Sequence, residues 1–213
     1  MDAKKIRDSI LPVVAVAATK TRSIEEIQEA IADGIRDIGE NRIQEADVKY
    51  AQLRALFAEK NVKFHFIGKL QKNKVKKAVS MFDLIQSVDS FELAAEIDRQ
   101  AGIIKKKQDI LVEVNIGEEP QKAGIIKDKL HKTLESIKQL PHVMVKGLMA
   151  IPPYTENPEA SRQYFREMKK IYEREKTPDF EFLSMGMSSD YKIAIEEGAN
   201  MVRLGTLLFG KRR

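Results

Sequence analysis

The chain has 213 residues, which one α/β domain can accommodate, and a formal net charge of +5, which permits an anionic ligand without requiring one. It contains no cysteine, which excludes disulfides, thiolate metal sites and cysteine nucleophiles. No apolar run is long enough for a transmembrane helix, and the first ten residues lack the apolar segment of a signal peptide, so we expect a cytoplasmic protein outside the membrane.

Eight short apolar or β-branched runs indicate buried strands. In chain order they cover residues 13–19, 37–40, 63–68, 83–88, 109–116, 143–151, 180–186 and 201–206. Longer charged segments carry apolar residues at three- and four-residue steps, which is the pattern of amphipathic helices. They cover residues 23–34, 42–60, 90–102, 127–140, 157–176 and 188–198. The first helix has the clearest boundaries, because Ser23 and Glu26 form a capping-box pattern and Gly34 follows the last turn.

The alternation of strands and helices predicts the fold. Strands separated by helices pair in parallel through crossovers. Eight such units fit a (β/α)8 barrel, and a doubly wound open sheet is the alternative. The count of eight favours the barrel, with residues 1–213 as a single domain, since no linker or repeat interrupts the pattern.

Lys20 follows the first predicted strand, at the end where barrels carry their chemistry. Lysine is rare at the end of a buried run. A lysine amine in a partly apolar barrel mouth can act as a nucleophile and form Schiff bases with carbonyl compounds. The alternative is that Lys20 lies just past the strand and points into water.

The ends of the last two strands indicate a phosphate site. Glycine at Gly205 lets backbone N–H groups approach an anion, and the hydroxyls of Ser184, Ser188 and Thr206 can donate to it. The helix expected near Ser189 adds further N-terminal donors. The alternative is that these residues are ordinary turn glycines and helix caps.

Arg203 and His65 stand inside predicted strands. A buried arginine needs a partner, so Arg203 either pairs with Glu40 or Asp190 or donates to an anion or an aromatic nitrogen. His65 lies between two phenylalanines, which favours a hydrogen-bonded core residue. The histidines lack metal-ligand spacing, so we expect no metal site.

A run of lysines between positions 69 and 77 is the most basic stretch of the chain. Clusters of this kind mark nucleic-acid surfaces or solvated helix faces. Because no aromatic residue is interleaved with the lysines, the solvated face is favoured and nucleic-acid binding is not expected.

Several motifs together resemble the pyridoxal phosphate homeostasis protein family: "AATKT", "IGENRIQE", "FHFIGKLQKNK", "GLMAI", "FLSMGMSSDYKIAIEEGANMVRLGTLLFG". They extend from about residue 13 to residue 211. One departure is Ser23, where many members have proline. The resemblance implies a barrel of the alanine racemase N-terminal type that binds pyridoxal 5′-phosphate (PLP).

The resemblance also implies the cofactor contacts. Lys20 would form the Schiff base, and Arg203 would face the pyridine nitrogen. The phosphate would be held by Ser184, Gly186, Gly205 and Thr206, and the ring would be surrounded by Asn41, His65 and Met149.

The resemblance further implies a carrier that binds, buffers and delivers PLP, with apo PLP-dependent enzymes as recipients and no catalytic residue. An arginine beside the ring nitrogen tends to leave that nitrogen unprotonated, which weakens the ring as an electron sink. The chain ends soon after the eighth run, so we expect no second domain and a monomer. The alternatives are a small PLP-dependent racemase or lyase that uses Lys20 as base, with Tyr154 or Tyr191 nearby, and an RNA-binding protein.

Overall fold

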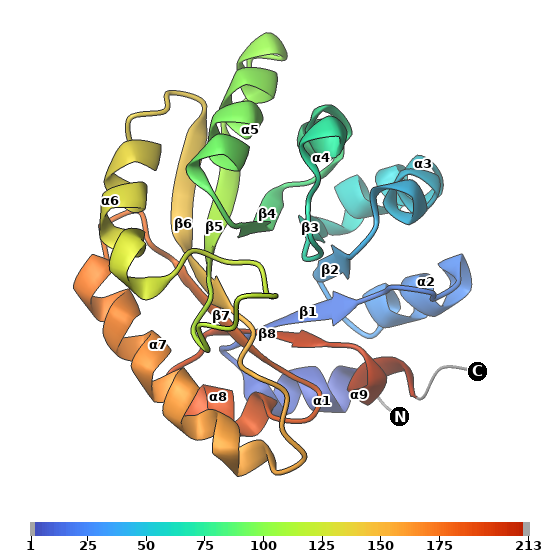
Figure 1. The fold of residues 1–213 in the computed structure, drawn as a ribbon. Coiled ribbons are helices and arrows are strands. Elements are labelled where there is room, and N and C mark those ends of the chain that lie inside the picture. Colours follow the sequence, from blue (N-terminus) through green and yellow to red (C-terminus); the bar gives the residue numbers. More distant parts are fainter. Residues whose placement is uncertain (1–2, 211–213) are drawn as a thin grey trace.

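The computed structural model describes residues 3–210 and shows a closed barrel of eight parallel strands (Figure 1). Each strand pairs with the next in the chain, and β8 closes the barrel on β1. The strands are β1 Val14–Ala18, β2 Asp37–Glu40, β3 Lys63–Phe66, β4 Leu84–Val88, β5 Gln108–Val114, β6 Val143–Ala150, β7 Phe182–Met187 and β8 Met201–Leu204. The predicted (β/α)8 barrel is confirmed, and the open sheet is wrong.

Helices surround the barrel and cover the outer side of the strands (Figure 1). They are α1 Ala3–Ile10, α2 Ile24–Ala32, α3 Ile43–Lys60, α4 Val75–Met81, α5 Phe91–Ile103, α6 Lys127–Ile137, α7 Arg162–Glu175, α8 Tyr191–Glu196 and α9 Thr206–Phe209. Two 3₁₀ turns, Lys72–Lys74 and Pro158–Ser161, precede α4 and α7. The predicted domain 1–213 includes residues 1–2 and 211–213, which lie outside the described part of the chain.

The predicted boundary signals at α2 are present. The Ser23 hydroxyl accepts from the Glu26 N–H at 3.2 Å, and the Glu26 carboxylate accepts from the Ser23 N–H at 2.8 Å. Gly34 then adopts a φ of +93°, a conformation that glycine tolerates best. The absence of proline at position 23 therefore leaves a complete helix cap.

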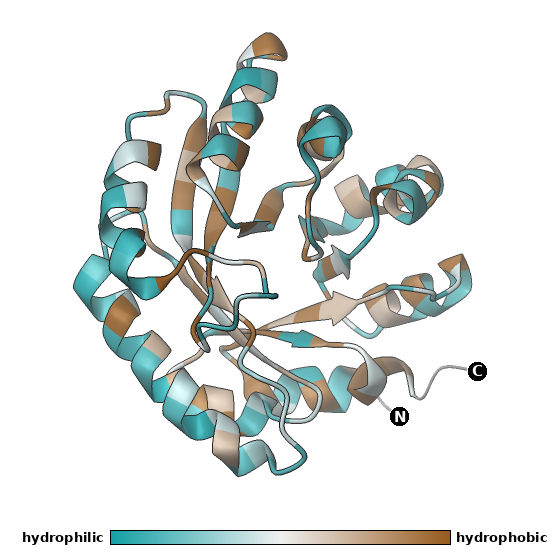
Figure 2. Ribbon diagram, viewed as in Figure 1, coloured by the Kyte–Doolittle hydropathy of each residue, from teal (hydrophilic) through white to brown (hydrophobic). Residues whose placement is uncertain are grey.

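Apolar side chains form two separate layers. Inside the barrel, a small cluster includes Val16, Leu111, Met149 and Met201. A much larger cluster lies between the strands and the helices, where Phe64 contacts three other rings. Figure 2 shows the result: strands are mostly hydrophobic, and helices carry hydrophilic residues on their outer sides.

Several predicted elements differ in extent. The lysine run forms a 3₁₀ turn and the start of α4, where Val75 and Ala78 are buried while Lys76 and Lys77 face solvent. The eighth strand ends at Leu204 and not at residue 206 as predicted, and Thr206–Phe209 form α9.

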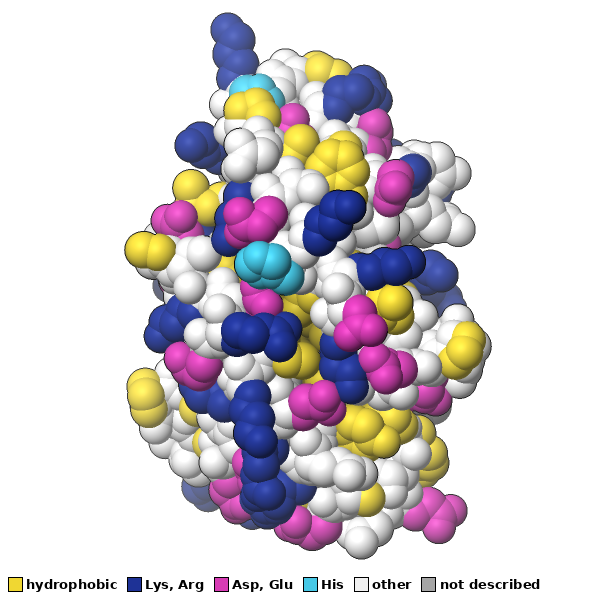
Figure 3. Space-filling view, turned by 60° about the vertical axis from the view of Figure 1, so that its left-hand side comes forward, with side chains coloured by type: hydrophobic (Ala, Val, Ile, Leu, Met, Phe, Trp, Pro, Cys, Tyr) yellow, Lys and Arg dark blue, Asp and Glu magenta, His cyan; other side chains and the backbone are white. Residues whose placement is uncertain are grey.

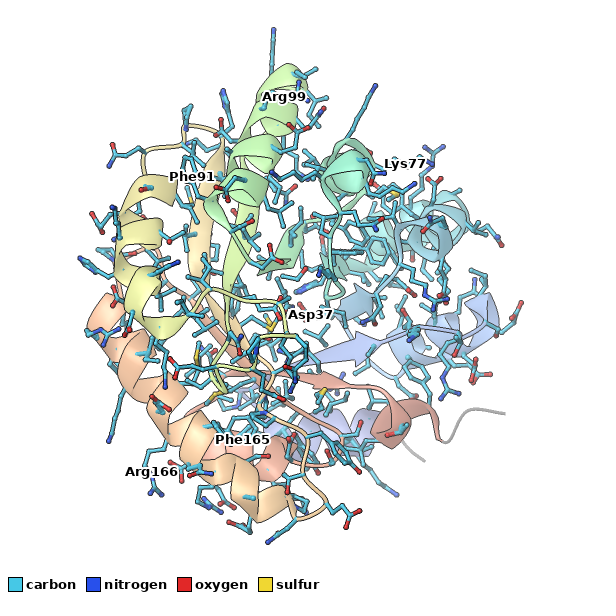
Figure 4. All side chains as sticks on the ribbon, viewed as in Figure 1. Asp37, Lys77, Phe91, Arg99, Phe165 and Arg166 are labelled. Carbon is cyan, nitrogen blue, oxygen red and sulfur yellow. The ribbon has the colours of Figure 1, made fainter. Side chains whose placement is uncertain are left out.

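The outer surfaces of the helices carry mixed charge. On the face shown in Figure 3, basic and acidic side chains are interspersed. Arg162 on α7 illustrates the pattern, since it pairs with Glu159, Glu196 and Glu197. Figure 4 shows Lys77, Arg99 and Arg166 on the outer sides of their helices. Among the helices of the described residues, none is both long and apolar enough to span a bilayer.

Candidate functional site

A cavity of about 380 Å³ opens at the end of the barrel where the strands finish. Its wall includes five of the nine cofactor contacts that the resemblance implies: Lys20, Asn41, Arg203, Gly205 and Thr206. These residues come from the ends of β1, β2 and β8, which lie side by side in the closed barrel. Chain segments almost 200 residues apart therefore meet at one site.

Lys20 stands on a tight turn directly after β1. The Thr19 N–H donates to Gly39 on β2, the Arg22 N–H donates back to Thr19, and Thr21 adopts a φ of +64°. Within residues 3–210, no acceptor pairs with the half-buried Lys20 ammonium group. The turn thus presents a free amine on the cavity wall.

A buried polar cluster between α3, the end of β2 and Thr19 holds this turn in place. Lys49 on α3 donates to Glu40 at 2.6 Å and to Glu45 at 2.7 Å, and the Thr19 hydroxyl donates to Glu40 at 2.6 Å. Burial raises the pKa of Glu40, although hydrogen bonds from Lys49 and Thr19 oppose the rise. One Glu40 oxygen, Oε2, is buried without a hydrogen-bond partner in the described protein.

Arg203 is 5% exposed and is held by oxygen atoms that carry no net charge. It donates to the Ser184 carbonyl at 3.0 Å, the Ser184 hydroxyl at 2.6 Å and the Ala150 carbonyl at 3.0 Å. Burial lowers the pKa of Arg203 to about 10, so the guanidinium remains cationic at neutral pH. Its other N–H groups have no acceptor in the described protein, and Arg203 is one of the residues that line the cavity.

Arg203 forms no ion pair with Glu40 or Asp190 in the described protein, so the first of the two alternatives considered for Arg203 is wrong. Glu40 pairs with Lys49 instead, and an Asp190 oxygen accepts from the Met187 N–H at 2.6 Å. Both carboxylates are therefore occupied by nearer donors.

The short helix α9 begins at the cavity. The Ser188 hydroxyl oxygen accepts from the N–H groups of Gly205 at 3.1 Å and Leu207 at 3.2 Å. A methyl group built on Gly205 would make only an ordinary van der Waals contact, with Ala18 at 3.7 Å. Gly205, Thr206 and Ser188 line the cavity here, and a glycine beside two hydroxyl side chains suits the binding of an oxyanion.

Comparison with known proteins identifies the family of this chain. A family model described as "Alanine racemase, N-terminal domain" matches residues 3–213. The "Pyridoxal phosphate homeostasis protein" of Aquifex aeolicus (strain VF5) is 45% identical over 201 residues, which cover 93% of this chain and 86% of that protein. The chain belongs to the pyridoxal phosphate homeostasis protein family. The resemblance seen in the motifs is thereby confirmed.

Solved structures of similar proteins agree with this family and fold. PipY of Synechococcus elongatus PCC7942, solved with PLP bound, has a TM-score of 0.89 and 36% identity, with coverage of 99% of this chain and 100% of that one. Alanine racemase from Corynebacterium glutamicum has a TM-score of 0.76 at 15% identity, covering 99% of this chain and 60% of that one. The second similarity supports the barrel fold alone.

Four predicted site residues of this family member do not line the cavity. Met149 is buried in the apolar cluster inside the barrel, and Ser184 is buried beneath the cavity wall, where its hydroxyl accepts a hydrogen bond from Arg203. Gly186 packs against α8, where an added Cβ would lie 2.5 Å from Ala194. His65 is 2% exposed and is hydrogen-bonded to neighbouring strands. Their contact with a ligand stays a prediction.

Sequence reasoning overlooked other parts of the wall. Arg22, two residues after Lys20, donates to the carbonyls of Phe209 at 3.1 Å and Gly210 at 2.6 Å, and it also lines the cavity. Ile67 and Ile151 complete the apolar part of the wall. Both isoleucines lie near the C-terminal ends of the predicted strands three and six. That position could have indicated that they line the cavity.

Proposed function

We propose that this protein binds PLP covalently and reversibly and serves the cell as a carrier that buffers and delivers it. The observation that carries the proposal is the free Lys20 amine on the same cavity wall as Arg203 and the start of α9. The relatives named pyridoxal phosphate homeostasis protein and the PLP-bound PipY structure support it. When bound, PLP supplies an aldehyde and an electron-accepting ring.

The donor set of the cavity suits the three functional parts of PLP. The Lys20 amine would condense with the aldehyde carbon and release one water molecule. Gly205, Thr206 and Ser188 would hold the phosphate, and a free N–H of Arg203 would donate to the ring nitrogen. Asn41 borders the same space. Each role rests on the chemistry of the side chain and on its position at the cavity.

The composition of the wall favours a carrier over a racemase or lyase. Among the described residues that line this cavity there is no aspartate, glutamate, histidine or tyrosine, so Lys20 is the lining side chain best suited to proton transfer. Tyr154, one of the two tyrosines considered from the sequence, is 89% exposed. Racemisation needs a second proton donor on the opposite face of the substrate carbon, and this wall does not provide one.

Borohydride reduction followed by peptide mass mapping tests the binding proposal. The wild-type protein should carry the pyridoxyl group on Lys20, and Lys20→Ala should lose it. Lys69→Ala, which removes an exposed lysine near the rim, is the matched control and should label normally. Labelling centred on another lysine would overturn the assignment.

Exchange and transfer measurements separate the carrier from the enzyme. Incubation of the loaded protein with alanine and serine enantiomers in deuterium oxide should give no sustained α-proton exchange. Incubation with an apo PLP-dependent enzyme should restore that enzyme's activity while the carrier loses its bound chromophore. Sustained exchange would favour the racemase or lyase.

Three further expectations accompany the proposal. They are action in the cytoplasm, a monomeric state and no binding of nucleic acid by the Lys69–Lys77 run. Analytical ultracentrifugation measures the oligomeric state. Incubation with a mixed RNA pool at low salt, where phosphate contacts are strongest, tests whether the protein binds nucleic acid.

A further inference from the structure

A continuous series of hydrogen bonds crosses the inside of the barrel and ends at Arg203. Its successive heavy-atom distances are 3.1 Å from Asp37 to His65, 2.9 Å from His65 to Gln86, 2.7 Å from Gln86 to Ser184 and 2.6 Å from Ser184 to Arg203. His65, Gln86 and Ser184 are each at most 2% exposed. Asp37, labelled in Figure 4, is the first residue of β2 and lies at the opposite end of the strands from the cavity.

The direction of these hydrogen bonds is fixed from the Arg203 end. A guanidinium only donates, so the Ser184 oxygen accepts and the Ser184 hydroxyl proton goes to the Gln86 oxygen. The Gln86 amide nitrogen then faces His65 Nδ1 and also Met201 Sδ at 3.3 Å. Because a thioether sulfur only accepts, the methionine supports the same amide orientation independently.

This orientation determines the form of the histidine. His65 Nδ1 must accept from Gln86, so the ring proton is on Nε2 and is donated to the Asp37 carboxylate. Every bond in the series therefore points from Arg203 towards Asp37. A different histidine tautomer would require the glutamine amide to turn and the serine to lose its acceptor.

The surroundings make this polar series unusual. Val16, Leu111, Met149 and Met201 fill the same interior, and an apolar residue in place of Gln86 would avoid the cost of burying an amide. The amide nevertheless makes three contacts, and its only link towards the cavity is through Ser184. The arrangement therefore serves the orientation of Arg203 more directly than it serves packing.

We propose that Gln86 and His65 are positioning residues that hold the Ser184 hydroxyl and, through it, the Arg203 guanidinium in the orientation that faces the cavity. The proposal rests on the proposed PLP function, because the ligand that Arg203 faces is the cofactor ring. Hydrogen bonding at the ring nitrogen tunes the electronic properties of PLP. A change at Gln86, beyond the cavity wall, should thus alter the spectrum of the bound cofactor.

The first test uses the wild-type protein without cofactor. ¹⁵N NMR of the histidine ring should show His65 protonated on Nε2 and unprotonated on Nδ1. A ring protonated on Nδ1 would overturn the inferred direction of the series. This measurement needs neither a variant nor PLP binding, so it stands apart from the proposed function.

The second test compares two buried glutamines. Gln86→Met should shift the absorption maximum of bound PLP and weaken PLP binding about tenfold. That loss is the effect expected if the misplaced Arg203 guanidinium no longer donates its hydrogen bond to the ring nitrogen. Gln108→Met is the matched control: Gln108 is also fully buried on a strand, but it donates to the carbonyls of Asp83 and Asp109, outside the series. It should retain the wild-type spectrum and affinity.

Ser184→Ala removes the link next to Arg203 and provides a second variant if Gln86→Met does not fold. It should reproduce the spectral shift. A wild-type spectrum and an affinity within twofold of wild type in either folded variant would overturn the positioning role. A wild-type protein that does not take up PLP at all would instead overturn the proposed function.

Discussion

Lys49 donates a 2.6 Å hydrogen bond to the backbone carbonyl of Thr19, the residue that precedes Lys20. Glu45, which also accepts from Lys49, receives the Thr21 N–H on the other side of Lys20. Burial raises the pKa of Glu45, but hydrogen bonds from Lys49 and Thr21 outweigh burial and lower the pKa below its ordinary value. This carboxylate is therefore ionised at neutral pH. A buried ion cluster thus fixes the backbone on both sides of the cavity lysine.

Lys49→Met should destabilise the fold, because it removes the cation that accompanies the fully buried Glu40. Breaking a buried ion pair on one side costs about 3–5 kcal/mol. Burial already raises the pKa of Glu40, so the carboxyl can take up a proton at lower pH. We therefore expect the larger loss at pH 8 and a smaller one at pH 5, measured by urea unfolding.

The double variant Lys49→Met/Glu40→Gln is the control for that explanation. It removes the uncompensated charge, so it should recover part of the lost stability at pH 8 and show little dependence on pH. A single variant that loses less than about 1 kcal/mol at pH 8 would show that the cluster contributes little.

Glu113 on β5 should make the protein less stable at alkaline pH. Burial raises the pKa of Glu113 from 4.5 to about 7, although the charge of Arg203 opposes the rise. The folded protein thus holds this proton more tightly than the unfolded chain does, and stability falls as pH rises from 4.5 to 7. At 1.36 kcal/mol for each pKa unit, the loss is on the order of 3 kcal/mol.

Glu113→Gln should remove this pH dependence and raise the stability at pH 8 on the order of 2–3 kcal/mol. Urea unfolding of wild type and variant at pH 5 and pH 8 measures the difference. Glu92→Gln changes an exposed glutamate of α5 and is the control, with no expected effect. Equal unfolding free energies of wild type and Glu113→Gln at both pH values would contradict the expectation.

The fold and the centre of the site could be predicted because they depend on local pattern. Eight strand runs imply a barrel, and a barrel collects strand ends at one rim, so Lys20, Asn41 and Arg203 were expected together. Side-chain direction and partner choice depend on distant segments. Gln86 and Ser184 are 98 positions apart, and nothing in either local sequence indicates their 2.7 Å contact.

Helix α9 and the acceptors of Arg203 were not predicted, because both depend on contacts with backbone carbonyl groups of distant segments. Helix α9 has four residues, too few for an amphipathic period, and it is held by Arg22 through carbonyl groups almost 190 positions away. The ion pair considered as one alternative for Arg203 does not form, because backbone carbonyls and one hydroxyl take the place of a carboxylate as acceptors. Every residue carries a backbone carbonyl, so the sequence does not indicate which of them accepts a hydrogen bond from Arg203.

Arg22→Ala should weaken the binding of PLP more than that of pyridoxal, which lacks the phosphate. Arg22 joins the Lys20 turn to the end of α9, at whose start Gly205 and Thr206 line the cavity, and its guanidinium also lies 5.4 Å from the centre of the Phe209 ring. Loss of this link should loosen the phosphate donors. We expect about tenfold weaker PLP binding and less than about threefold weaker pyridoxal binding, by fluorescence titration.

Arg36→Ala provides the matched comparison for Arg22. Arg36 also donates to two backbone carbonyls, those of Ile31 and Ile35, but it lies at the start of β2, away from the cavity. It should leave the ratio of the two affinities unchanged. Equal losses for both ligands in Arg22→Ala would show that Arg22 has no special relation to the phosphate.

Two glycines at the rim should respond to alanine in opposite ways. A Cβ on Gly68 would lie 2.2 Å from the Asn41 carbonyl oxygen, so Gly68→Ala must displace backbone and should cost about 1–3 kcal/mol of stability. A Cβ on Gly205 meets nothing closer than 3.7 Å, so Gly205→Ala should change the unfolding free energy by at most about 0.5 kcal/mol. Because its methyl would enter the space assigned to the phosphate, Gly205→Ala should nevertheless weaken PLP binding. Urea unfolding and PLP titration of both variants measure the two effects, and undiminished PLP affinity in Gly205→Ala would place the phosphate elsewhere on the wall.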